Sequence, residues 1–469
     1  MRDLSTLDHA LHHRLSRRAF CLTADVADHL RCSLREVHID LRGTITNRCP
    51  SGKDPRSLPL TMARQNPPLS SVLSPLICGT ATFNSQYNPD PYVLPTTGIV
   101  HRALSLGVRA FDTSPYYGPA EDLLGQALDT RFVQDSYPRR DYVLCTKVGR
   151  IAGSEFDYSP EWVHYSVQRS RERLRTEYLD LVYCHDVEFV SPEEVLQAVK
   201  ELRRIRDETG TLKYVGISGY PVSTLCDLAE MVLRETGEAL DAVMSYANYT
   251  LQNTKLYTEG LPRLKAAGVD VVLNASPLGM GLLRRDGVPV GGQGDFHPAE
   301  DGLRKACREA SDFCRAHGEK LEVVAIRFAL ENWLRDGAEV GSTGGSVSVM
   351  TPRGESEEQY KGRKLGVSVM GVSKMEELEE TMRVWRSILD GDGDGEQDKV
   401  AAGQAPDERE RSLARESEIQ RLAEGIRSVL GEWVDHSWAS PGPDFVNMRS
   451  KSTTAQGDTS AANRKGSGT

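Results

Sequence analysis

The sequence lacks long hydrophobic runs, paired cysteine motifs and an excess of positive charge. No apolar stretch approaches the roughly 18 residues that a membrane-spanning helix needs. With 57 Lys and Arg residues against 67 Asp and Glu residues, the formal net charge is −10, which repels nucleic acid and anionic lipid. The nine cysteines are scattered and odd in number, which favours reduced thiols. We therefore expect a cytoplasmic protein that binds neither nucleic acid nor membranes.

Two ligand-binding motifs are also missing, the glycine-rich motif of dinucleotide-binding domains and the acidic loop of calcium sites. Gly279 and Gly281 form only a lone Gly-x-Gly, and no Gly-x-Gly-x-x-Gly follows an early strand, which argues against a Rossmann domain. The run DGDGDGE at 390–396 resembles the start of a calcium loop, but no Glu stands at position 12 of that loop. We expect no metal site.

From residue 71 onward, short apolar runs alternate with longer amphipathic stretches. The candidate strands are the runs at 75–80, 108–112, 142–147, 179–185, 213–218, 241–246, 269–276 and 367–372. Helix-like segments lie between them, and the one at 191–206 begins with Ser191 as its N-cap and a proline at its first position. Parallel strands need connections of helix length, so this repetition predicts an α/β fold. Eight such units favour a (β/α)₈ TIM barrel rather than an open sheet.

The other segments are predicted to be appendages of a barrel at 71–390. They are a disordered N-terminal extension at 1–70, a flexible Gly-rich insertion at 336–366, a linker at 391–411, a C-terminal helix at 412–435 and a disordered tail at 436–469. The apolar stripe of the C-terminal helix, which includes Ile419, Leu422 and Ile426, should dock on the barrel.

The N-terminal extension allows two further interpretations. Arg14, Arg17 and Arg18 are typical of a transit peptide, but the acidic residues of the same segment, such as Asp8 and Asp25, are not. Alternatively, Met62 is the real start, and the first 61 residues are a gene-model or disordered extension. Neither interpretation changes the predicted barrel.

Polar side chains stand at the ends of three successive candidate strands. Asp112, Lys147 and His185 end the second, third and fourth strands, and Tyr117 follows Asp112 by five residues. Active sites of such barrels lie at the carboxyl ends of the strands, so these side chains should converge at one mouth. Asp112 and Lys147 must then neutralise each other, because an unpaired buried charge costs several kcal/mol. Each residue alone would read as an ordinary polar strand terminus; together they favour an active site.

The segments around these residues resemble those of the aldo-keto reductases. They are FDTSPYYGPAEDLLGQAL, CTKVG, LDLVYCHD, YVGISGY and NASPLGMGLL, in the family's order over roughly 73–390. The resemblance implies a catalytic tetrad of Asp112, Tyr117, Lys147 and His185. A narrower resemblance, carried by GISGY, ASPLGMGLL and His297, is to NAD-dependent sugar dehydrogenases of the D-arabinose 1-dehydrogenase and L-galactose dehydrogenase type.

This resemblance implies hydride transfer from C1 of an aldose to nicotinamide, giving an aldonolactone. Tyr117 would move the proton of the reacting oxygen, with Lys147 favouring its phenolate. Asp112 would hold Lys147 in place, and His185 would orient the substrate oxygen. Two alternatives remain open: a cofactor-binding regulatory subunit of the channel-associated type, and a general aldehyde reductase.

The expected cofactor segment is the last candidate strand with the helix after it, because a helix N-terminus suits a phosphate. The resemblance implies cofactor binding by Thr80, Ser218, Ser245, Ser276, Leu278, Gly371, Ser373, Glu377, Glu380 and Thr381. The family's nicotinamide contacts are altered at Gly219 and Ala275, which stand where an Asn and a stacking aromatic residue are usual.

Glu377 decides the expected form of the cofactor. It stands where NADP-dependent members carry the arginine that binds the 2′-phosphate. A carboxylate repels a phosphate but accepts hydrogen bonds from a free ribose hydroxyl, so we expect NAD rather than NADP. Lys374 is the counter-argument, because its ammonium group could still reach a phosphate.

Overall fold

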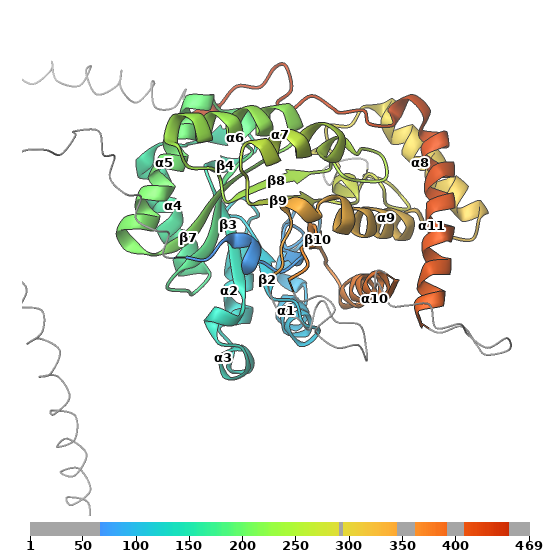
Figure 1. Ribbon diagram of the computed structural model, residues 1–469, viewed down its shortest axis with the longest axis horizontal. Helices are drawn as coiled ribbons and strands as arrows, with labels where there is room; N and C mark the ends of the chain where they lie inside the picture. Colours follow the sequence, from blue (N-terminus) through green and yellow to red (C-terminus); the bar gives the residue numbers. More distant parts are fainter. Residues whose placement is uncertain (1–65, 290–293, 345–361, 392–407, 450–469) are drawn as a thin grey trace, which may run out of the picture. The chain divides into compact units, whose positions relative to one another are not determined.

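The computed structural model describes residues 66–289, 294–344, 362–391 and 408–449, all within the compact unit Arg64–Thr469. Within them, parallel strands form a closed barrel in the order β1-β10-β9-β8-β7-β6-β3-β2 (Figure 1). The strands are β1 (Leu76–Gly79), β2 (Ala110–Asp112), β3 (Val143–Val148), β6 (Leu179–His185), β7 (Leu212–Gly219), β8 (Ala242–Tyr246), β9 (Val271–Ala275) and β10 (Val367–Gly371). They coincide with the candidate strands, and the predicted (β/α)₈ barrel is confirmed.

Helices connect the strands and cover the barrel. They are α1 (Thr96–Ser105), α2 (Ala120–Leu128), α3 (Arg131–Ser136), α4 (Pro160–Arg173), α5 (Pro192–Thr209), α6 (Val222–Thr236), α7 (Leu261–Ala266), α8 (Asp301–Ala316), α9 (Leu321–Asp336), α10 (Met375–Gly391) and α11 (Glu408–Leu430). Local sequence explains their ends, as α5 shows. Its N-cap Ser191 forms a capping box with Glu194, and Gly210 ends it in the left-handed conformation that glycine adopts without strain.

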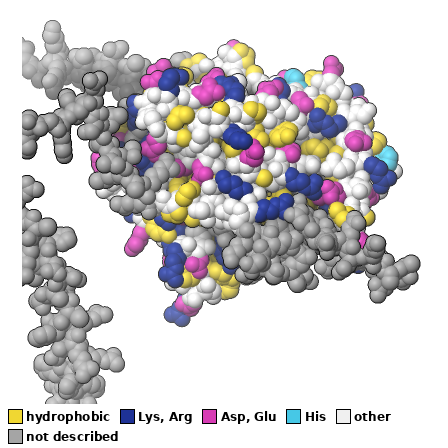
Figure 2. Space-filling model, viewed as in Figure 1, with side chains coloured by type: hydrophobic (Ala, Val, Ile, Leu, Met, Phe, Trp, Pro, Cys, Tyr) yellow, Lys and Arg dark blue, Asp and Glu magenta, His cyan; other side chains and the backbone are white. Residues whose placement is uncertain are grey.

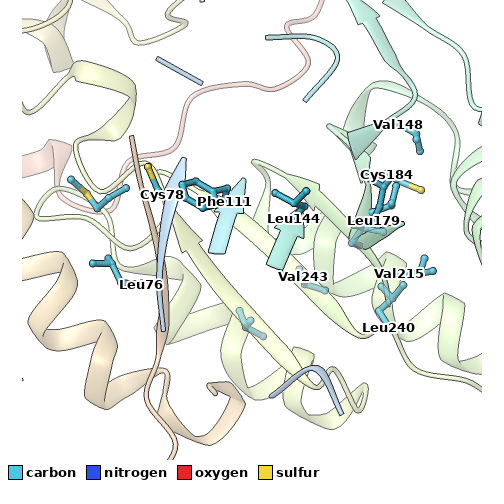
Figure 3. Packing of buried hydrophobic residues seen from close by; sticks show 14 of the residues in the cluster. Leu76, Cys78, Phe111, Leu144, Val148, Leu179, Cys184, Val215, Leu240 and Val243 are labelled. Atoms are coloured by element: carbon cyan, nitrogen blue, oxygen red, sulfur yellow. The ribbon is translucent and has the colours of Figure 1, made fainter. Parts of the chain in front are cut away.

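Each barrel strand buries both of its faces. Ile77 points into the barrel interior, whereas its neighbour Cys78 belongs to the cluster between strands and helices. In that outer cluster, Cys78, Phe111 and Leu144 lie side by side because they are register partners on β1, β2 and β3 (Figure 3). Burial on both faces is typical of parallel sheets, and it holds the strand ends that carry the polar residues in fixed positions.

A short hairpin that the sequence did not predict follows β3. Its strands are β4 (Arg150–Ala152) and β5 (Glu155–Phe156). The chain enters it through Gly149, whose φ is 98° and whose added Cβ would lie 2.2 Å from the Tyr158 ring. Only glycine fits there, and the turn sets Arg150 beside the carboxyl end of the barrel.

Helix α11 packs beside α8, α9 and α10 (Figure 1). The predicted stripe of Ile419, Leu422 and Ile426 is buried in one cluster with residues of α8. The helix begins at Glu408 rather than at 412 and ends at Leu430, followed by the 3-10 turn Gly431–Trp433. The expected docking is therefore present, with the helix shifted toward the N-terminus.

The chain after α11 is ordered up to residue 449, contrary to the expectation of a disordered tail from 436. Trp438 stacks on Tyr220 with ring centres 4.3 Å apart. Farther along, the amide of Asn447 pairs with both backbone groups of Phe156 in the hairpin. These contacts need a partner surface that exists only once the barrel has formed, so local composition did not reveal them.

The ends of the predicted flexible insertion are also ordered. Ser342 pairs with Leu365 in a β-bridge, and its hydroxyl donates to the carbonyl oxygens of Ser70 and Leu73. Leu69 lies in the barrel interior cluster, so the last residues of the predicted N-terminal extension belong to the core. Predictions for 1–65, 345–361, 392–407 and 450–469 concern residues outside the described part of the chain.

The face shown in Figure 2 carries acidic and basic side chains interspersed with one another. Among the described residues, no helix has both the length and the apolar character needed to cross a membrane. The same residues contain no group of three or more His, Cys, Asp or Glu side chains placed to hold a metal ion.

Candidate active site

A cavity of about 940 Å³ opens at the carboxyl ends of the barrel strands. Its lining includes Asp112, Tyr117, Lys147 and His185, so the fold brings the four predicted side chains to one site. From there the cavity extends to the beginning of α10. A cavity of this size falls in the range of small-molecule and cofactor sites.

Asp112 and Lys147 form a buried ion pair at the base of the cavity. Lys147 Nζ lies 2.7 Å from Asp112 Oδ1 and donates a second hydrogen bond to the Thr113 carbonyl oxygen at 2.9 Å. Burial lowers the pKa of Lys147, but the attraction and hydrogen bonds of Asp112 and Tyr117 together outweigh it, and the net shift is upward. The Lys147 ammonium is therefore the favoured form in the folded protein.

Tyr117 lies against this pair. Lys147 Nζ is 4.8 Å from the centre of the Tyr117 ring. Burial raises the pKa of Tyr117, the Lys147 ammonium lowers it, and Asp112 raises it again; the net direction is upward. The phenol is thus protonated at neutral pH, and Lys147 reduces the free energy needed to remove its proton.

His185 is a neutral imidazole facing Tyr117. Burial lowers the pKa of His185 to about 3. Its Nδ1 lies 3.0 Å from the Ser114 hydroxyl oxygen, which also accepts the Tyr116 backbone N–H at 3.1 Å. Nε2 lies 3.5 Å from Asp186 Oδ2, a carboxylate oxygen that can only accept, which favours the tautomer with the N–H on Nε2 and lets the Ser114 hydroxyl donate to Nδ1. A neutral imidazole with Nε2–H can donate to a substrate oxygen.

The sequence did not predict a second charged pair in the cavity, Arg150 with Asp186. The Arg150 guanidinium forms an ion pair with Asp186 and lies 3.9 Å above the ring of Tyr116. Asp186 directly follows His185 at the end of β6 and has a left-handed backbone with φ of 55°. Its place at a strand end was the available signal, but its partner lies on the unpredicted hairpin.

Most of the expected cofactor residues line the cavity. They are Ser218, Ser276, Leu278, Gly371, Ser373, Glu377, Glu380 and Thr381. Thr80 and Ser245 are fully buried and do not line it. The Thr80 hydroxyl donates to the Asp112 carbonyl oxygen at 3.1 Å, and the Ser245 hydroxyl oxygen accepts a hydrogen bond from Asn248 at 3.0 Å. Thr80 therefore stabilises the backbone at Asp112, and Ser245 stabilises the position of the Asn248 side chain.

The backbone N–H groups at the beginning of α10 are not all free to bind a phosphate. The Ser373 backbone N–H donates to the Glu377 carboxylate at 2.7 Å, so this amide already has an anionic partner. A phosphate could use it only if Glu377 moved. Lys374 at this end of the cavity and Arg284 on the loop after β9 are further cations in its lining. Both are of the kind that binds phosphate groups in proteins.

The C-terminal chain completes the cavity wall with Trp438, Ala439, Ser440 and Gly442. The Ser440 hydroxyl donates to Glu188 at 3.0 Å, and the Tyr220 backbone N–H donates to the same oxygen at 3.1 Å. Burial raises the pKa of Glu188 to about 8. From its sequence this segment was predicted to be a disordered tail, so this part of the site was not predicted.

A parallel barrel with a buried Asp–Lys pair, a tyrosine and a neutral histidine at its carboxyl end has the groups that a nicotinamide-linked oxidoreductase needs. The profile of the Aldo/keto reductase family matches residues 75–394, and the chain belongs to this family of oxidoreductases.

The chain is similar to three sugar dehydrogenases. D-arabinose 1-dehydrogenase of Saccharomyces cerevisiae is 44% identical over 271 residues, which cover 57% of this chain and 78% of the yeast protein. L-galactose dehydrogenase of Arabidopsis thaliana is 36% identical over 236 residues, which cover 50% of this chain and 69% of the plant protein. D-threo-aldose 1-dehydrogenase of Pseudomonas sp. is 28% identical over 271 residues, covering 52% and 78%.

Proposed function

We propose that this protein oxidises an aldose at C1 with NAD as the hydride acceptor and forms an aldonolactone. The observation that carries the proposal is the Asp112–Lys147 pair, buried beside Tyr117 in a cavity that also holds neutral His185. Similarity to three aldose-oxidising relatives supports the choice of substrate class.

A nicotinamide dinucleotide fits the residues of the cavity. The lining runs from the tetrad to the beginning of α10 and includes the cations Arg284 and Lys374, which suit a pyrophosphate. Ser218 and Ser276 offer hydroxyl groups for polar contacts. A bound nicotinamide would supply the acceptor for the hydride that leaves C1 of the sugar.

Tyr117 removes the proton from the anomeric hydroxyl group as the C1–H bond breaks. The electron pair of that bond leaves as hydride, the C1–O bond becomes a carbonyl, and the hydroxyl proton passes to the Tyr117 oxygen. Lys147 stabilises the phenolate that this step requires. His185 donates from Nε2 to the sugar oxygen and holds it toward Tyr117. The raised pKa of Tyr117 keeps the base form scarce at neutral pH, so oxidation should accelerate in alkaline solution.

Preference for NAD over NADP follows from the charge at the beginning of α10. Glu377 and Glu380 both line this part of the cavity, with Lys374 as the opposing cation. The Glu377 carboxylate is held by the Ser373 N–H, which fixes a negative charge in the wall. The carboxylate would repel a 2′-phosphate, whereas it could accept a hydrogen bond from a free ribose hydroxyl.

We also propose a reducing compartment, the cytoplasm. The cysteines in the described part of the chain are all free and buried: Cys78, Cys145, Cys184, Cys226, Cys307 and Cys314. Burial raises the pKa of Cys78 and Cys184 to about 12, which keeps these thiols unreactive.

The test is a panel of aldoses with NAD and with NADP, read by the absorbance of reduced nicotinamide. We expect aldose-dependent reduction of NAD, lost in Tyr117→Phe, with lactone detected as the product. Reduction of apolar aldehydes without aldose oxidation would instead identify a general aldehyde reductase. Cofactor binding without turnover of either class would identify a regulatory subunit.

A further inference from the structure

A second group of polar side chains lines the cavity next to the tetrad. It consists of Tyr116, Arg150 and Asp186, which we call the polar wall. Tyr116 is adjacent to Tyr117 in sequence, with ring centres 6.3 Å apart, and Asp186 follows His185. The polar wall therefore stands beside the reacting position and contacts the tetrad at one point, where Asp186 Oδ2 lies 3.5 Å from His185 Nε2.

The polar wall has unused hydrogen-bonding capacity. The Tyr116 hydroxyl oxygen accepts hydrogen bonds from Arg150 and from Gln86, both at 3.1 Å, which leaves its own proton to donate. Each terminal nitrogen of the Arg150 guanidinium carries two N–H groups, and among the described residues each uses one of them, Nη1 for Asp186 and Nη2 for Tyr116. Within the same described part of the chain, Asp186 Oδ1 accepts no hydrogen bond, because its contacts use Oδ2. Two donor groups and one acceptor are thus available.

The position of these groups is fixed. The Arg150 guanidinium lies over the Tyr116 ring and within 5.4 and 5.6 Å of the ring centres of Phe156 and Phe189. Only 17% of the Arg150 side chain and 3% of the Asp186 side chain are exposed. An acceptor without a partner in a largely buried side chain, such as Asp186 Oδ1, costs free energy, so it is expected where a ligand supplies the missing donor.

The charges of the polar wall cancel. Arg150 and Asp186 form an ion pair, so the wall presents donors and an acceptor without net charge. A hydroxyl group both donates and accepts, so adjacent hydroxyl groups match this arrangement. A carboxylate only accepts and would meet the Asp186 charge.

We propose that Tyr116, Arg150 and Asp186 form a subsite that binds the hydroxyl groups of a neutral aldose away from C1. The subsite selects polyhydroxylated substrates over apolar aldehydes, because an apolar substrate leaves its polar groups unpaired. This inference rests on the proposed aldose oxidation and names the residues that bind the hydroxyl groups of the sugar.

The experiment compares aldose oxidation with benzaldehyde reduction in Tyr116→Phe and Arg150→Met. Tyr116→Phe removes one hydroxyl oxygen and keeps the ring, so kcat/KM for the best aldose should fall about tenfold while that for benzaldehyde changes by less than about twofold. Arg150→Met should lower the aldose-to-benzaldehyde ratio further. Any damage to the tetrad would reduce both activities, so the ratio isolates the subsite.

The matched controls are Tyr165→Phe and Arg140→Met, whose side chains lie on the surface and should leave the ratio unchanged. If aldoses are oxidised but both cavity variants reduce the two activities equally, the subsite is wrong and the proposed function stands. If the wild type reduces benzaldehyde and oxidises no aldose, the proposed function fails, and the subsite fails with it. Should Arg150→Met lose its thermal transition, Tyr116→Phe alone decides.

Discussion

Lys147 Nζ lies 2.7 Å from Asp112 Oδ1, and both side chains are almost fully buried beneath the tyrosine that we propose as the proton acceptor. The two charges come from the ends of β2 and β3, which are hydrogen-bonded neighbours in the barrel. The pairing therefore depends on the parallel register of two strands, and it couples the stability of the barrel to the chemistry at its mouth.

We predict that Asp112→Asn destabilises the fold by about 3–5 kcal/mol, because it leaves the Lys147 ammonium buried without its counter-charge. Chemical denaturation of both proteins would measure the difference. Glu379→Gln is the control, because it breaks the half-exposed Arg102–Glu379 pair at 3.0 Å and should cost less than about 1 kcal/mol. Equal losses in the two variants would contradict the importance of burial.

Tyr117→Phe should lower turnover by about 10²–10⁴-fold with cofactor binding retained, because only the phenol oxygen is lost. Single-turnover kinetics and cofactor titration would measure the two quantities separately. In the wild type, the rate of oxidation should rise from neutral to alkaline pH, since the pKa of Tyr117 is raised above its ordinary value. A variant with near-normal turnover would refute the assignment of Tyr117.

Glu377→Arg should raise the ratio of kcat/KM with NADP to that with NAD by about tenfold, which corresponds to about 1.4 kcal/mol. The substitution also removes the acceptor of the Ser373 N–H. Glu377→Gln is therefore the matched variant, because its amide oxygen can keep that hydrogen bond while the charge is lost, and it should give a smaller change. A wild type that already prefers NADP would disprove the role of Glu377.

Glu188→Gln should stabilise the protein at pH 8.5–9 and have little effect at pH 5. The folded state raises the pKa of Glu188 to about 8 from its ordinary value of 4.5, so it binds the proton more tightly than the unfolded chain does. The stability from that proton is complete below the unfolded pKa and is lost as pH rises through the folded pKa. Gln mimics the protonated acid at every pH. Thermal unfolding at both pH values measures the effect, and an equal shift at pH 5 and pH 9 would show that titration is not its cause.

The barrel and its tetrad could be predicted from the sequence, because both leave local signals. Apolar runs separated by helix-length segments predict parallel strands, and Asp112, Lys147 and His185 each end such a run. In a parallel barrel, the carboxyl ends of all strands lie at the same end of the barrel. Convergence of these side chains therefore required only the strand order, which successive units supply.

Other contacts of the site left no local signal. Asp186 stands at a strand end, but its pairing with Arg150 depends on a hairpin that the chain enters through Gly149, and the two partners are 36 residues apart in the chain. Likewise, Trp438 stands in a polar segment whose composition predicts disorder. Its position depends on stacking against the Tyr220 ring, which the local sequence does not reveal.

The sequence by itself determined the (β/α)₈ barrel and the placing of Asp112, Lys147 and His185 at strand ends, because strand periodicity and strand-end chemistry are encoded over a few residues each; the family followed from the resemblance of its motifs. Only the tertiary structure decided that the C-terminal chain up to residue 449 closes the cavity, and that Glu377 holds the Ser373 amide before any phosphate arrives. It also decided the net directions of the pKa shifts at Tyr117 and His185. Those properties arise from burial and from charges brought together over long sequence separations, which no local pattern records.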